Sequence, residues 1–207
     1  MDSKLYFDSV SPEWDEMRKQ AFSGMVRERA ISAAGVQPGR IAADIGAGTG
    51  FITEGLLAHD VRVVATDQSE RMLGELGSKF EDARVECRVG LAERLPLEDN
   101  EVDYVFANMY LHHVESPANA IREMVRTLKP GGRLVITDLD AHGHEFLRVE
   151  QFDRWMGFER EDVRVWFEAA GLHGITVDGV GEDCCAPSRS GGVTARISIF
   201  IAAGQKP

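Results

Sequence analysis

Residues that could perform chemistry gather in three places, and each place directly follows a short apolar run. The first is ADIGAGTG (43–50), in which the acid Asp44 stands ahead of closely spaced glycines. The second is ANMYLHHV (107–114), and the third is TDLDAHGHE (137–145). Glycine lets a backbone turn tightly and approach a ligand closely, and histidine titrates near neutral pH. These residue types therefore indicate a ligand site that also holds groups able to exchange a proton.

The glycine spacing and the acid together indicate which cofactor the first loop accepts. Dinucleotide-binding loops read G-x-G-x-x-G, whereas Gly46, Gly48 and Gly50 read G-x-G-x-G. Phe51 stands where the dinucleotide pattern has its last glycine. A pyrophosphate next to Asp44 would be repelled by like charge, while a ligand that carries an ammonium and a sulfonium would be attracted. The loop therefore predicts S-adenosylmethionine, which has a net positive charge.

A second acid supports a nucleoside ligand. Asp67 ends the apolar run VVATD, about 20 residues beyond the glycines, where a carboxylate can accept hydrogen bonds from ribose hydroxyls. Met72 follows five residues later and is placed either to pack on an adenine face or to fill the core. We therefore predict that Asp67 binds the ribose, a role that both candidate cofactors share.

These groups need a scaffold that brings several strand ends together. Apolar runs predict strands at 41–45, 61–66, 83–89, 102–107, 133–139, 173–180 and 195–203. Amphipathic stretches predict helices at 49–58, 69–79 with Ser69 as cap, 117–128 and 159–170. This alternation is typical of βαβ units and a parallel sheet that is covered on both faces. We predict one doubly wound α/β domain over residues 36–207.

Residues 1–35 are predicted to form an N-terminal helical arm ahead of this domain. Ser11 is the expected N-cap and Pro12 the first helical residue. Tyr6, Phe7 and Trp14 on the arm either close over an acceptor as a lid or pack the arm onto the domain. A homodimer formed through the arm is left open.

The composition predicts a protein that binds neither nucleic acid nor membrane. The 207 residues include 34 acidic and 23 basic ones, and the net charge of −11 repels phosphate backbones and anionic membranes. No apolar run approaches the roughly 20 residues that span a bilayer, and the N-terminus does not read as a signal peptide. We therefore expect a cytoplasmic protein. The odd set of 3 cysteines and the histidine spacings predict neither a disulfide framework nor a metal site.

Four runs of the chain resemble class I S-adenosylmethionine-dependent methyltransferases, and in particular the small-molecule branch that includes ubiquinone and menaquinone biosynthesis enzymes. The runs are ADIGAGTGFIT, VVATDQSERML, LAERLPLEDNEVDYVFANMYLHHV and IREMVRTLKPGGRLVITDL, in the family's order over about residues 40–140. The resemblance implies an enzyme with a Rossmann-like sheet of seven strands, the last one antiparallel.

The same resemblance implies where the cofactor lies. It assigns the methionine end to Asp44, Gly46 and Gly48, the ribose to Asp67, and the adenine to Met72, Ala92 and Glu93. Leu91 stands where the family often has an acid that bonds the adenine amino group, so this contact falls to backbone groups or to Glu93. The complete set of predicted cofactor residues is Asp44, Gly46, Ala47, Gly48, Asp67, Gln68, Met72, Ala92, Glu93 and Asn108.

A narrower resemblance covers residues 138–172. This segment is similar to methyltransferases fused to arsenic-repressor-like transcription regulators, in which a histidine precedes an EFLR-like run. His142 and residues 145–148 match that pattern, and YFDSVSPEWDEMR (6–18) also looks like the corresponding N-terminal segment.

The expected reaction is an in-line transfer of a methyl group to a small-molecule acceptor. Such a transfer requires alignment and exclusion of water, and a base only where the acceptor arrives protonated. His112 and His142 are the predicted catalytic residues because they follow adjacent strands and could act as that base.

Three other functions stay open. A soft acceptor, a thiol or a metalloid, would be met by Cys184 and Cys185 in the DCCAPS loop. An NAD-dependent oxidoreductase would use a related sheet, although Asp44 and Phe51 argue against it. A non-catalytic module would bind the cofactor as a signal and contact a protein partner.

Overall fold

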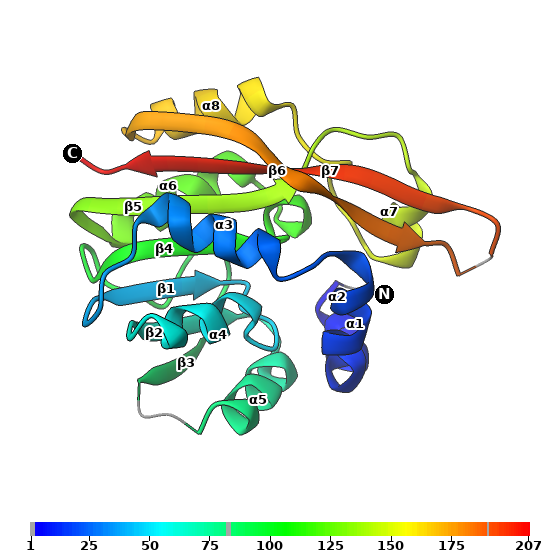
Figure 1. The fold of residues 1–207 in the computed structure, drawn as a ribbon, viewed down its shortest axis with the longest axis horizontal. Coiled ribbons are helices and arrows are strands. Elements are labelled where there is room, and N and C mark those ends of the chain that lie inside the picture. Colours follow the sequence, from blue (N-terminus) through cyan, green and yellow to red (C-terminus); the bar gives the residue numbers. More distant parts are fainter. Residues whose placement is uncertain (1–2, 82–83, 190) are drawn as a thin grey trace.

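The computed structural model describes residues 3–81, 84–189 and 191–207. The first two residues of the predicted arm and Ala83, where the third strand was expected to begin, lie outside the described residues. Within those ranges seven strands form one sheet in the order β3-β2-β1-β4-β5-β7-β6 (Figure 1). The strands are β1 (Ile41–Ile45), β2 (Arg62–Asp67), β3 (Val85–Val89), β4 (Val102–Asn108), β5 (Leu128–Leu139), β6 (His173–Pro187) and β7 (Thr194–Gln205).

The pairing confirms the predicted fold class. Strands β1 to β5 are parallel to one another. The last strand, β7, lies between β5 and β6 and is antiparallel to both. The order reverses at β1, which pairs with β2 on one side and with β4 on the other. In open α/β sheets this reversal is where ligands bind, beyond the carboxyl ends of the strands.

Helices cover both faces of the sheet because side chains alternate along each strand. Ala42 and Phe106 pack on one face with α3 (Met25–Ala34), α4 (Phe51–Ala58) and α5 (Glu70–Lys79). Ala43 and Val105 pack on the other face with α6 (Pro117–Thr127) and α8 (Arg160–Ala169). The two apolar layers hold the strand ends, and with them the loops that follow, in fixed positions.

Several local predictions agree with the structure. The Ser69 side chain accepts a hydrogen bond from Met72 N at 3.0 Å and so caps α5 as predicted. Helix α4 begins two residues later than expected because Gly50 takes a left-handed conformation, with φ 91°, and closes the turn first. In the described part of the chain no helix has the length and apolar character needed to cross a membrane.

The predicted start of the helix within the arm is wrong. A helix, α1 (Ser3–Val10), already precedes Ser11, and the Ser11 hydroxyl donates back to Asp8 O at 3.3 Å instead of capping a following helix. Pro12 lacks the N–H that an α-helix would use, so the chain forms the short 3-10 helix η1 (Ser11–Glu13) before α2 (Trp14–Ala21).

The last two strands also run further than the sequence suggested. β6 and β7 continue as a two-stranded ribbon beyond the expected ends at 180 and 195. Figure 1 shows this ribbon extending past β1 and β4 toward α7 (Phe146–Glu150), a short helix that the sequence did not predict. The ribbon carries Cys184 and Cys185 over the carboxyl ends of the parallel strands.

Candidate active site

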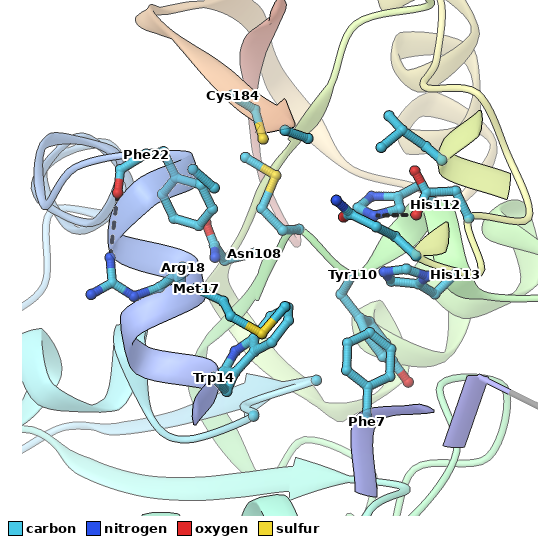
Figure 2. A pocket seen from close by; sticks show the side chains of 18 of the residues that line it. Phe7, Trp14, Met17, Arg18, Phe22, Asn108, Tyr110, His112, His113 and Cys184 are labelled. Carbon is cyan, nitrogen blue, oxygen red and sulfur yellow. Dashed lines mark hydrogen bonds and ion pairs between the residues drawn. The ribbon is translucent and has the colours of Figure 1, made fainter. Parts of the chain in front are cut away.

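A cavity of about 250 Å³ lies at the carboxyl ends of the parallel strands. Its walls come from the glycine loop after β1, the ends of β2 and β4, the arm and the β6–β7 ribbon. Figure 2 shows His112 and His113 on one side of this cavity and Trp14, Met17 and Phe22 on the other. Seven of the ten predicted cofactor residues line it, namely Gly46, Ala47, Gly48, Asp67, Gln68, Met72 and Asn108.

The glycine loop and Asp67 form one connected rim. Gly48 N donates to Asp67 Oδ2 at 3.0 Å, and Ser69 N donates to Asp67 Oδ1 at 2.9 Å. Burial raises the pKa of Asp67, against these hydrogen bonds that lower it. The carboxylate is thus fixed between the two loops while lone pairs remain for further donors.

Asp44 does not line the cavity. It is buried behind the loop, where its Oδ2 accepts from Thr53 N at 3.0 Å and from Thr53 Oγ1 at 2.7 Å. These bonds replace the side-chain cap that Gly50 cannot give to α4. Burial raises the pKa of Asp44 to about 6. Its carboxyl therefore lies beneath the glycines, apart from the cavity wall, and a role for Asp44 in cofactor binding stays a prediction.

Two further predicted cofactor residues, Ala92 and Glu93, do not line the cavity. They lie behind Tyr110. Ala92 is buried, and Glu93 Oε1 accepts from Glu115 N at 3.0 Å. The Tyr110 hydroxyl hydrogen-bonds to the Ala92 backbone, and burial raises its pKa. A Cβ placed on Gly46 would lie 2.2 Å from the Tyr110 ring, so only glycine allows this packing.

His112 is held by a buried carboxylate. Its Nδ1 lies 2.6 Å from Asp138 Oδ1, and Asp138 is fixed by bonds from Leu111 N and Leu139 N. Burial disfavours the charged imidazole, but the charge and hydrogen bond of Asp138 outweigh it and raise the pKa of His112 to about 9. The second ring nitrogen, Nε2, is left to act at the cavity wall.

Two further groups join His112 at this wall. The ring centroids of His112 and His113 are 4.1 Å apart, and His113 Nδ1 lies 3.4 Å from Phe152 O. Burial and the neighbouring His112 hold the pKa of His113 well below its usual value. Asp153 is 2% exposed and its Oδ1 has no hydrogen-bond partner. Burial raises the pKa of Asp153 to about 6.

The sequence does not single out Asp153, because it lies in an irregular segment after α7 and the resemblance over residues 138–172 assigns it no role. His142, the other predicted catalytic residue, is not among the residues that line the cavity. Its Nδ1 accepts from His144 N at 3.3 Å and its Nε2 is buried without a partner. A catalytic role for His142 stays a prediction.

The arm and the cysteines do reach the cavity. Tyr6, Phe7 and Trp14 line it, and the Phe7 ring packs edge-on against His113 with centroids 5.1 Å apart. Cys184 and Cys185 line it as well, and burial raises the pKa of Cys184 to about 12. The Cys184 thiol is therefore neutral near pH 7 and is a poor nucleophile.

The arm is tied to the domain by side chains. Ser69 Oγ donates to Asp8 Oδ1 at 2.6 Å, and Thr49 Oγ1 donates to Asp15 Oδ1 at 2.7 Å. Lys79 Nζ lies 2.9 Å from Asp15 Oδ2. These contacts place the arm over the cavity; whether it opens and closes as a lid stays a prediction.

Comparison with known proteins agrees with the family resemblance of the sequence. Residues 43–136 match the family described as "Methyltransferase domain". Demethylmenaquinone methyltransferase of Renibacterium salmoninarum is 35% identical over 135 residues, which cover 64% of this chain and 56% of that protein. The chain thus corresponds to little more than half the length of this relative.

Solved structures show the same fold. A Haloferax volcanii methyltransferase solved with the Trm112 methyltransferase activator has a TM-score of 0.78 and 19% identity, with 97% of each chain covered. A Haemonchus contortus phosphoethanolamine N-methyltransferase, in complex with phosphomonomethylethanolamine and S-adenosylhomocysteine, has a TM-score of 0.72 and 19% identity. It covers 87% of this chain and 52% of its own. At this level of identity the matches show the shared fold alone.

Proposed function

We propose that this chain is a class I S-adenosylmethionine-dependent methyltransferase that transfers a methyl group to a small-molecule acceptor; the methyltransferase domain matched over residues 43–136 and the fold support this. The observation that carries the proposal is the single cavity that joins the glycine loop and Asp67 to His112. The bound cofactor would supply a methyl group that its sulfonium already activates. The protein then has to align the acceptor with it and exclude water.

The residues along one part of the cavity suit this cofactor. Gly46 and Gly48 line the cavity with backbone in a left-handed conformation that glycine adopts readily, and the Asp67 carboxylate is fixed at the rim for ribose hydroxyls. Thr137 Oγ1 donates to Asn108 Oδ1 at 2.8 Å, which leaves the Asn108 NH₂ group free to donate toward the methionine carboxylate. Met72, 1% exposed, supports the adenine side from the core.

The remaining part of the cavity suits a small acceptor with an apolar body and one polar end. Aromatic and thioether side chains of the arm and its junction form one side, including Phe7, Trp14 and Met17. His112, His113 and Asp153 form the polar end. Apolar walls with a few fixed polar groups are the usual form of a small-molecule site.

We propose that His112 activates the acceptor at this polar end. Asp138 holds its ring in one orientation, so that Nε2 is the atom available at the cavity. A thiol or metalloid acceptor bound jointly by Cys184 and Cys185 has weaker support. Both residues line the cavity, but burial raises the pKa of the Cys184 thiol to about 12, so it is neutral near pH 7 and a poor ligand for a soft acceptor.

Calorimetry with S-adenosylmethionine and S-adenosylhomocysteine tests the proposal directly. We expect saturable binding of both, and loss of both in Asp67→Ala, with the fold checked by circular dichroism. Glu75→Ala, which removes an exposed acid from the middle of α5, is the matched control. Release of S-adenosylhomocysteine in the presence of hydroxylated, amino and thiol aromatic compounds then identifies the acceptor. No cofactor binding at millimolar concentration would end the proposal, and binding without turnover of any acceptor would favour the non-catalytic module.

A further inference from the structure

The polar end of the cavity brings together three potential metal ligands. One nitrogen each of His112 and His113 and one carboxylate oxygen of Asp153 all lie within 4.8 Å of one another. The two histidines come from the 3-10 helix η2 (Leu111–His113), whereas Asp153 comes from the segment after α7. We call these three residues the His-His-Asp cluster.

The hydrogen bonds of both histidines leave the same ring atom available. His112 Nδ1 bonds to the Asp138 carboxylate at 2.6 Å, and His113 Nδ1 bonds to the Phe152 carbonyl at 3.4 Å. Each ring therefore has its Nε2 free of these anchoring bonds. Metal-ligating histidines almost always use their other nitrogen in this way, on a carboxylate or a backbone carbonyl.

Asp153 supplies an independent sign that the cluster lacks a partner. Its Oδ1 is buried and has no hydrogen bond, although a buried carboxylate oxygen is costly when it is left unpaired. The nearest imidazole atom, His112 Nε2, is 3.9 Å away, which is too long for a hydrogen bond. A divalent ion with ligand bonds of about 2.0–2.2 Å would fit between two atoms at this separation.

We propose that His112, His113 and Asp153 bind one divalent transition-metal ion of the Zn²⁺ type at the end of the acceptor cavity. Imidazole and carboxylate ligands suit such ions, and three protein ligands with an open position are the arrangement of catalytic sites. All three side chains line the cavity, so the open position faces it. Asp138 is a positioning residue that acts through His112.

The ion also explains how His112 activates an acceptor, a role that rests on the proposed function. An acceptor hydroxyl that binds at the open position becomes more acidic because the cation stabilises its conjugate base. Held by His112, His113 and Asp153, the ion would in this way supply an acceptor oxygen that has lost its proton to water. The oxygen lone pair could then take up the methyl group, while the electrons of the carbon–sulfur bond stay with the sulfur. Metal binding itself does not depend on this step.

The test is Zn²⁺ binding to the untagged, chelator-treated full chain, measured by calorimetry in the absence of cofactor. We expect one equivalent of Zn²⁺ and a rise in Tm on its addition. His113→Ala and Asp153→Asn should each weaken binding by more than about tenfold, and Asp138→Asn by about 10- to 100-fold. His173→Ala, an exposed histidine at the start of β6, is the matched control and should bind as the parent does.

The absorption spectrum of bound Co²⁺ provides a second readout, which would not change if the three residues had only a structural role. We expect visible absorption bands from nitrogen and oxygen ligands in the parent chain, and their loss in His113→Ala. Circular dichroism in chelator shows whether each variant folds. Absence of Zn²⁺ binding to the parent, or equal binding in the His113 and Asp153 variants, would overturn the proposal. So would binding that disappears only in Cys184→Ser/Cys185→Ser. Metal binding without S-adenosylmethionine binding would remove the proposed function and leave this inference standing.

Discussion

Replacement of Asp44 by Asn tests two effects of this buried charge: its effect on the stability of the fold and its effect on the affinity of the site for a cation. The buried carboxyl has a folded-state pKa of about 6, raised from 3.8 mainly by burial. A raised folded-state pKa means that the unfolded chain ionises more readily, so this group destabilises the fold increasingly as pH rises from about 4 to about 6. Relative to a neutral side chain of the same shape, the ionised group costs about 3 kcal/mol at pH 7 and about half of that at pH 5.

We therefore expect Asp44→Asn to be more favourable at pH 7 than at pH 5. The Asn oxygen can still accept from Thr53, but an amide hydrogen left without an acceptor would cost about 1–3 kcal/mol. The net change at either pH thus depends on that hydrogen, whereas the difference between the two pH values does not. Urea unfolding of the parent and the variant at pH 5 and at pH 7 measures this difference in the stability change. Asp103→Asn is the matched control, and its stability change should differ little between pH 5 and pH 7. Backbone and lysine contacts outweigh burial and lower the pKa of Asp103, so this carboxyl is ionised in both the folded and the unfolded chain over that range.

The same substitution tests why the chain keeps a charge that destabilises it. At an effective dielectric constant of about 20, a unit charge roughly 10 Å from a sulfonium contributes about 1.7 kcal/mol, a factor of about 20 in affinity. S-adenosylhomocysteine lacks the sulfonium, so Asp44→Asn should weaken S-adenosylmethionine much more than its product. Equal loss for the two ligands, or no pH dependence of the stability change, would refute the electrostatic reasoning.

Three other substitutions probe the walls of the cavity. Gly46→Ala should destabilise the fold by at least about 1 kcal/mol, because Gly46 has a positive φ and lies against the Tyr110 ring. Adding Tyr110→Ala to the same chain should recover only the part of this loss that comes from the ring. Additive effects of the two substitutions in urea unfolding would contradict this. Asp15→Ala removes the bonds that tie the arm to the domain, so amide exchange in α1 and α2 should quicken while exchange in the sheet does not; unchanged exchange of the arm would contradict it. Cys184→Ser with Cys185→Ser should leave kcat/KM for an oxygen acceptor unchanged, and an equal loss on every acceptor would show that the thiols have a general role.

The parts of the site that the sequence predicted are those formed by local structure. A strand, a glycine turn and a helix are adjacent in the chain, so the spacing of Gly46, Gly48 and Asp67 already determines that they share one rim. The same argument gave Ser69 as a helix cap. The seven-stranded topology followed from the family resemblance, because periodicity alone does not assign the order of strands.

The parts that the sequence missed depend on contacts between distant segments. Asp153 reaches His112 only because the irregular segment after α7 folds back beneath the ribbon of β6 and β7. Tyr110 follows β4 and contacts both Gly46, which follows β1, and Ala92, which follows β3. These three loops are distant in the sequence, so no local pattern predicts their contact. His142 follows the expected strand but is not among the residues that line the cavity, since a position after a strand does not determine where a side chain points; its catalytic role stays a prediction.

Backbone strain locates the functional edge of the molecule independently of any motif. Four non-glycine residues in the described part of the chain have positive φ, and two of these, Asp60 and Asn100, are of types that tolerate it. The other two, Met109 and Phe152, have φ values of 49° and 62° and no such tolerance. A left-handed backbone costs residues of this kind about 1–2 kcal/mol each.

Met109 directly precedes Tyr110, and Phe152 directly precedes Asp153 and provides the carbonyl that His113 contacts. Both strained residues therefore set the position of side chains at the same cavity, where Asp153 also holds an unpaired buried oxygen. Nothing in the packing of the two apolar layers requires strain or unpaired charge at this place. Such costs persist where a site has to hold a particular geometry. The edge at His112, His113 and Asp153 is therefore where the chemistry of this protein should be sought, and not only in the glycine loop that it shares with the methyltransferases it resembles.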